Sequence, residues 1–141
     1  MKYEFTGKTK IVNGRTLKQI RALITILGVV NSGECGGWIE SEQNLAQTSG
    51  NAWVSGNAEV SGDAWVKNRN DFCTFSGFGS EYRTTTAFTD EKLGVRIACG
   101  CFSGSLDEFR AQIIKKHGTD SKHGRLYLSM ANMIEYRFTD N

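Results

Sequence analysis

The chain lacks proline, long hydrophobic runs and a large net charge. Without proline it has no polyproline linker and no PxxP recognition segment. Its longest apolar run, residues 22–30, falls well short of the roughly 18 residues that a membrane-spanning helix requires. A net charge of +2 does not by itself indicate nucleic-acid binding. With 141 residues, 39% of them hydrophobic, the chain is expected to bury a core as one domain or two small ones.

Cysteine and histidine are few, with four and two residues. The first residues contain no apolar signal region, so we expect no secretory signal and reduced thiols. Cys99 and Cys101 form a CxC pair, but no second pair completes a zinc tetrad, and we expect no metal or other cofactor. A catalytic thiolate requires a nearby base. His117 ends a predicted helix about 18 Å long, so we interpret both thiols as structural.

A six-residue repeat occupies the middle of the chain. The template Gly-[Asn/Asp]-Ala-x-Val-x occurs three times without a gap over residues 50–67. This period is typical of a short strand followed by a corner, with glycine supplying the unusual backbone angles. The Ala and Val positions are two residues apart, so both should point inward. Ile39 and Leu45, also six apart, predict a degenerate coil upstream.

The variable position of each repeat should point outward and holds Trp53, Glu59 and Trp65 in turn. Tryptophan side chains on the outside of a small coil need a cover. We therefore expect Trp53 and Trp65 to contact the C-terminal segment, a second subunit of a dimer or trimer, or a binding partner for which they would be anchors.

The flanking segments complete a mixed α+β, mainly β prediction. Residues 3–12 and 17–27 read as the strands of a hairpin around Asn13-Gly14. Residues 68–80 read as a polar connection, and residues 83–88 and 93–102 as two strands. Ser105 and Glu108 predict a capped helix ending near Gly118, and a last helix runs over residues 124–136. The predicted segments are an N-terminal hairpin (1–34), a very short left-handed parallel β-helix (35–67) and a C-terminal ββαα unit (68–141).

Several motifs together resemble small hexapeptide-repeat proteins of phages and prophages. The resemblance rests on residues 2–7, 13–17, 20–22, 36–42, the hexads, 84–86, 99–102 and 117–118. It covers nearly the whole chain in the same order, although those proteins usually carry more hexads. It implies a left-handed β-helix and a phage setting, hence the cytoplasm of an infected host. Some small phage proteins inhibit host defence, either by blocking a protein complex or by sequestering a nucleotide signal.

Function is therefore predicted as non-catalytic binding, with two alternatives. Hexapeptide-repeat acyltransferases resemble trimers with several coils and a catalytic histidine near them. Here His117 and His123 lie in the C-terminal part, and no histidine lies in residues 1–116. A structural virion component is the second alternative, although one clean coil makes a poor spike.

Two sets of residues are candidate contacts. Arg83 with Thr84, Thr85 and Thr86 offers a guanidinium and three hydroxyls for a phosphate or ribose. Residues 1–34 carry a net charge of +4, against −3 for residues 35–67 and +1 for residues 68–141. Arg15, Lys18 and Arg21 could thus form a basic patch for an anionic partner, or protect an edge strand.

Overall fold

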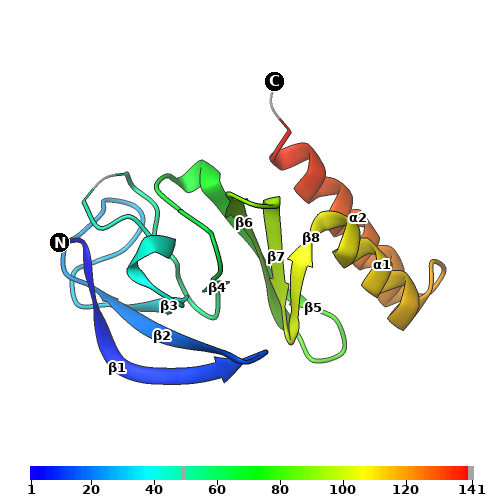
Figure 1. Ribbon diagram of the computed structural model, residues 1–141, viewed down its shortest axis with the longest axis horizontal. Helices are drawn as coiled ribbons and strands as arrows, with labels where there is room; N and C mark the ends of the chain where they lie inside the picture. Colours follow the sequence, from blue (N-terminus) through cyan, green and yellow to red (C-terminus); the bar gives the residue numbers. More distant parts are fainter. Residues whose placement is uncertain (49, 140–141) are drawn as a thin grey trace.

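A computed structural model describes residues 1–48 and 50–139. The fold is mixed α+β and mainly β, with three layers: a first sheet with the repeat, a second sheet, and two helices (Figure 1). The first sheet contains β1 (Tyr3–Val12), β2 (Arg15–Ala22), β3 (Cys35–Ile39) and β4 (Glu59–Val60). The second contains β5 (Phe72–Phe78), β6 (Arg83–Asp90), β7 (Gly94–Cys99) and β8 (Phe102–Ser105). The helices are α1 (Leu106–His117) and α2 (Lys122–Arg137), and short 3₁₀ helices lie at Glu42–Asn44 and Arg69–Asp71.

The N-terminal hairpin forms as predicted, but its second strand is shorter. Asn13 and Gly14 both have positive φ, 51° and 76°, as a type I′ turn requires. β2 ends at Ala22, which pairs with Tyr3 at the start of β1. Because β1 offers no partner beyond that point, residues 23–27 leave the sheet, and the prediction of a strand to residue 27 is wrong. Alternation of apolar residues continued past the place where pairing stopped.

The repeat packs its predicted inner face into the first core. The three Ala and three Val side chains of the template are fully buried: Ala52, Ala58, Ala64, Val54, Val60 and Val66. Ile39 pairs in parallel with Val60, and Leu45 with Val66, so the upstream segment stacks on the repeat. The predicted inward phase is therefore confirmed. The prediction for Trp53 is wrong, because this residue is only 4% exposed and belongs to the core rather than to the outer surface. Trp65 is 47% exposed.

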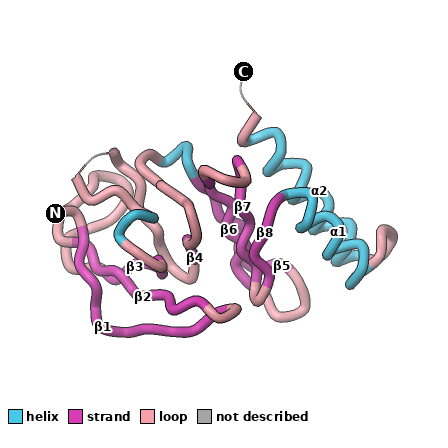
Figure 2. The backbone as a smooth tube through the Cα atoms, viewed as in Figure 1, coloured by secondary structure: helices cyan, strands magenta, loops and turns pink. Residues whose placement is uncertain are grey.

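The C-terminal unit has four strands rather than two. β5 forms in the segment read as a connection, because successive residues of Phe72–Phe78 pair with β6, and their apolar side chains pack against one core or the other. Residues 93–102 were expected as one strand, yet Gly100 (φ 58°) turns the chain there and separates β7 from β8. The result is an antiparallel meander in the order β5-β6-β7-β8. Figure 2 shows these strands between the first sheet and the two helices.

The second sheet is covered on both faces. Phe88 and Ala98 belong to the first core, while Ala87 and Ile97 on the same strands pack against the helices.

The predicted cap of α1 is confirmed, since Ser105 Oγ accepts from the Glu108 amide at 3.1 Å. α2 begins two residues earlier than expected. Its buried residues are Gly124, Tyr127, Met130, Ala131 and Ile134, whereas Leu126 and Met133 are exposed.

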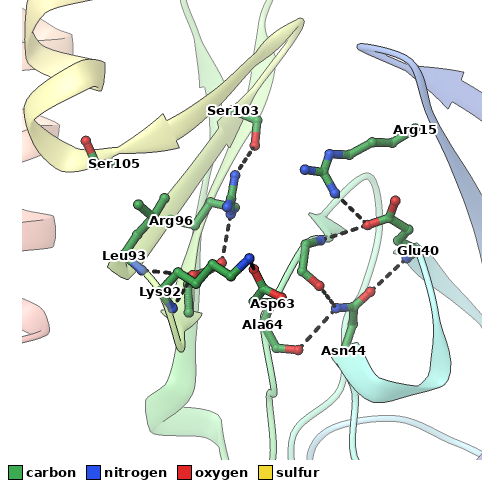
Figure 3. Close-up of polar contacts among 12 residues, drawn as sticks. Arg15, Glu40, Asn44, Asp63, Ala64, Lys92, Leu93, Arg96, Ser103 and Ser105 are labelled. Carbon is green, nitrogen blue, oxygen red and sulfur yellow. Dashed lines mark hydrogen bonds and ion pairs between the residues drawn. The ribbon is translucent and has the colours of Figure 1, made fainter.

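A polar network joins the layers between the two sheets (Figure 3). Arg96 on β7 donates to Asp90 on β6 at 2.8 Å and to Ser103 on β8 at 3.2 Å. On the other side, Asn44 donates to the carbonyls of Gly62 and Ala64, both at 3.1 Å. The Arg96 bonds lie within the second sheet and the Asn44 bonds within the first layer, and the ion pair of Asp63 in the repeat with Lys92, at 3.4 Å, crosses between them. No helix in the described part of the chain is long and apolar enough to cross a membrane.

Candidate functional site

A cleft of about 430 Å³ opens between the second sheet and the helices. The β5–β6 loop, the β7–β8 turn, the last turns of α1 and one residue of α2 enclose it. Its base is apolar and aromatic, formed by Phe102, Phe109, Ile113 and Tyr127. Its polar lining consists of Ser80, Glu81, Arg83, Cys99, Cys101, Gln112, Lys116 and His117. The cleft therefore combines an aromatic floor with a cationic rim, a combination suited to a ligand with an apolar ring and an anionic group.

Arg83 lies in the cleft because of its strand register and a glycine beneath it. It starts β6 on the face that packs against the helices, in phase with Thr85 and Ala87. A Cβ on Gly100 would lie 1.8 Å from Arg83 Nη1, so the guanidinium can occupy its position only because residue 100 has no side chain. Arg83 Nε donates to Glu81 Oε2 at 3.0 Å, and Nη2 contacts the same oxygen. The cation is thus paired with one exposed carboxylate.

The three threonines beside Arg83 do not reach the cleft. Thr84 and Thr86 point to the opposite face of β6, and Thr86 Oγ1 accepts from the Glu59 amide at 3.3 Å. Thr85 is fully buried and donates to Cys99 Sγ at 3.1 Å. Of the four residues predicted to hold a phosphate or ribose, only Arg83 is placed to do so. Successive residues of a strand alternate between its faces, so three in a row cannot share one surface.

Tyr127 forms the inner wall next to the Cys99 thiol. Its hydroxyl donates to the Phe78 carbonyl at 3.3 Å, and a Cβ on Gly79 would lie 2.3 Å from that hydroxyl. Burial, followed by the neighbouring Cys99, raises the pKa of Tyr127 to about 12. The phenol is therefore a neutral donor at physiological pH. All four cysteines are free, and Cys101 is exposed on the β7–β8 turn.

His117 ends α1 at the mouth of the cleft. Its ring stacks on Tyr127 with centroids 5.7 Å apart and an interplanar angle of 22°, and the His123 ring lies 5.9 Å away. The pKa of His117 lies below its ordinary value. Partial burial is the largest cause, followed by the charge of Lys116 and then by His123. The imidazole is therefore mainly neutral at pH 7 and offers one donor and one acceptor.

The cysteines and His117 line one cleft, contrary to the sequence prediction that the helix would separate them. The length assigned to the helix was correct, but its direction was not considered. Cys99 ends β7, and Cys101 lies in the turn that precedes β8. The chain reverses direction again at Ser105, where β8 ends. Helix α1 then runs back along the sheet and ends near that turn. The cleft histidine faces the second sheet and the β7–β8 turn, and no repeat residue lines the cleft.

Two of the three residues of the predicted basic patch on the first sheet pair with acidic residues of the chain. Arg15 pairs with Glu40 at 2.8 Å, and Arg21 pairs with Glu4 at 2.9 Å. Lys18 lies over the Phe5 ring, with its Nζ 5.3 Å from the centroid. All three side chains are partly buried, and the charges of Arg15 and Arg21 are compensated by these carboxylates, whereas Lys18 contacts an aromatic ring. Their positions fit the alternative of protecting a strand.

Sequence reasoning missed Glu81, Lys116 and Tyr127 as site residues. None of the three belongs to a motif that the sequence alone marks as functional. The available signal was glycine, since Gly79 and Gly100 lie at the turns that carry the cleft residues and have positive φ, 83° and 58°. Positive-φ glycines mark turns, and binding residues are concentrated at turns on a rigid scaffold.

Comparisons with protein-family models, curated proteins and solved structures yield no match. Within residues 1–48 and 50–139, no three His, Cys, Asp or Glu side chains are arranged to hold a metal ion. The fold and the cleft define a mixed α+β protein with a candidate site for a small organic ligand.

Proposed function

We propose that this protein is a non-catalytic binding protein whose cleft holds a small anionic ligand of the nucleotide class. The observation that carries the proposal is that Arg83, Lys116 and the aromatic residues Phe102, Phe109 and Tyr127 line one cleft. Guanidinium and ammonium groups bind phosphate, and aromatic side chains stack on a base. A volume of about 430 Å³ lies within the range of small-molecule sites.

The biological role that we propose is inhibition of a bacterial defence system by sequestration of a nucleotide signal in the host cytoplasm. Support comes from the resemblance to small phage proteins together with a cleft of suitable chemistry. Blocking of a defence protein complex is the second form of this role, and the exposed Trp65 is the remaining candidate anchor for it. The same side chain could equally contact a second subunit of a dimer or trimer.

We also propose that the repeat is a single coil of a left-handed β-helix stacked on a degenerate one. The buried Ala and Val positions, the parallel pairings to residues 39 and 45, and the positive φ of Gly50, Gly56 and Gly62 support this. The acyltransferase and virion alternatives receive no comparable support. The acyltransferase mechanism needs a histidine beside the coils, and His117 instead faces the second sheet.

Binding of nucleotides to purified protein tests the proposal. Isothermal titration calorimetry would use nucleoside mono-, di- and cyclic phosphates, with inorganic phosphate as the minimal anion. We expect Arg83→Ala to weaken binding about tenfold or more, because it removes charge-assisted hydrogen bonds. Lys116→Ala should weaken it by a smaller factor.

The matched control is Lys115→Ala, which removes the same charge from the neighbouring position of α1 outside the cleft. It should leave the affinity within about twofold, because an exposed charge outside the site is screened. Absence of binding across the panel, or equal binding by the wild type and Arg83→Ala, would contradict the proposal.

A further inference from the structure

Glu81 occupies a special position among the cleft residues. Among the residues that the structure describes, it is the one carboxylate in a lining that also contains Arg83, Lys116 and His117. One of its oxygens contacts both Nε and Nη2 of Arg83, the edge with which a guanidinium binds a carboxylate or a phosphate. A ligand anion entering the cleft would need this same edge.

The backbone holds Glu81 in place through a tight turn. The Tyr82 amide donates to the Gly79 carbonyl at 3.3 Å, which closes the turn over residues 79–82. Tyr82 has a positive φ of 53°, an uncommon conformation for a residue with a side chain. This turn places the Glu81 carboxylate beside the guanidinium two residues later.

We propose that the Glu81 carboxylate marks the anion subsite of the cleft and that a ligand phosphate takes its place on Arg83. This inference rests on the proposed function and assigns the position of the ligand's charged group. In the free protein, the Glu81 carboxylate occupies the position on Arg83 that the phosphate would take. The aromatic residues of the cleft bind the rest of the ligand.

A ligand phosphate can displace the Glu81 carboxylate from Arg83, because this ion pair is weak. The side chains of Glu81 and Arg83 are 66% and 39% exposed, and exposed pairs are weak because water and salt screen them. A phosphate monoester carries a charge of about −1.5 to −2 at pH 7 and three acceptor oxygens. It can therefore bind Arg83 and Lys116 together, whereas the Glu81 contact to Arg83 uses a single oxygen.

The thiol of Cys101 gives a readout that does not depend on knowing the ligand. Cys101 is exposed and follows Gly100, the residue beneath the Arg83 guanidinium. Anionic iodoacetate should sense the charge on Arg83, and neutral iodoacetamide should not. The ratio of the iodoacetate rate to the iodoacetamide rate at Cys101 is measured by peptide mass spectrometry. It therefore reports how far the Arg83 guanidinium is released from its pair with Glu81. Exposed Cys35, on β3 of the first sheet, is the internal control.

Glu81→Gln should raise this ratio at Cys101 about two- to fivefold and leave it unchanged at Cys35. Adding Arg83→Ala to Glu81→Gln should abolish the increase. Glu81→Asp keeps the charge but shortens the side chain, so it should give a smaller increase if displacement from Arg83 is the cause. An unchanged ratio in Glu81→Gln, or an increase that survives Arg83→Ala, would overturn the inference.

Phosphate binding provides the second measurement. Glu81→Gln should bind inorganic phosphate about two- to fivefold more tightly than the wild type. If the nucleotide panel binds to the wild type and the alkylation ratio does not change, the proposed function stands and the subsite is wrong. If the ratio changes and no nucleotide binds to either protein, the anion subsite stands and the nucleotide ligand is wrong.

Discussion

Asp90 is a buried carboxylate whose charge is compensated by its hydrogen-bond partners. Its side chain is completely buried at the end of β6 and lies 2.8 Å from Arg96 Nε. It also accepts hydrogen bonds from the Lys92 and Leu93 amides, at 2.9 and 3.0 Å. Burial alone would raise the pKa of Asp90, but the hydrogen bond from Arg96 and those from the two amides outweigh it and hold the pKa below its ordinary value. The charged form is therefore part of the folded state.

Asp90→Asn should lower the free energy of unfolding by about 3 kcal/mol at pH 7, because it leaves Arg96 buried without its counter-charge. A depressed carboxyl pKa stabilises the fold above the ordinary Asp value of 3.8, and this stability is lost as pH falls through the depressed pKa. The difference between the variant and the wild type should therefore shrink in acid. Urea denaturation at pH 7 and pH 3 measures both effects.

Asp63→Asn is the control for this residue. Asp63 pairs with Lys92 at 3.4 Å, and their side chains are 37% and 76% exposed, so the change should cost less than about 1 kcal/mol. Equal losses in the two variants would show that the buried pair contributes no more than a surface one.

Local patterns predicted some elements and failed on others for a common reason. The hairpin turn and the helix cap depend on contacts within a few residues, so their sequence signals were sufficient. The ends of β2 and β7 depend on where a partner strand stops and where Gly100 turns the chain. Apolar alternation runs through both points, and only pairing decides them.

At helix α1, the cap is a distinct contribution to stability. Ser105 Oγ accepts from the Glu108 amide, and Glu108 Oε1 accepts from the Ser105 amide at 3.0 Å. Ser105→Ala should lower the free energy of unfolding by about 1 kcal/mol, because one amide of the first turn loses its partner. Chemical denaturation followed by circular dichroism measures it. Glu108→Gln keeps an acceptor at that position and should cost less; a larger loss would contradict the capping role.

Across the whole molecule, the second sheet is shared between two cores. Phe88 and Ala98 close the first core, while the next residues back along each strand, Ala87 and Ile97, close the second. Asp90 also bridges to Ala64 in the repeat. The separate segments expected from composition therefore share one central layer, and neither core is complete without it.

This arrangement predicts a single cooperative unfolding transition. All three tryptophans lie in residues 38–65, and both α-helices follow residue 105. Tryptophan fluorescence and helical circular dichroism therefore report on opposite sides of the shared sheet. The two probes should give coincident urea curves. Separate midpoints would mean that the layers unfold independently.

The sequence by itself determined the features that depend on short-range geometry: the Asn13-Gly14 turn, the inward phase of the hexads and the start of α1. Each follows from steric or hydrogen-bonding preferences within a few residues. Tertiary structure alone decided the burial of Trp53 and the cleft around Arg83. Arg83, Cys101, Lys116 and Tyr127 meet because β8 and α1 reverse the chain over one sheet. The position of a side chain after such reversals depends on packing between distant segments, which no local pattern encodes.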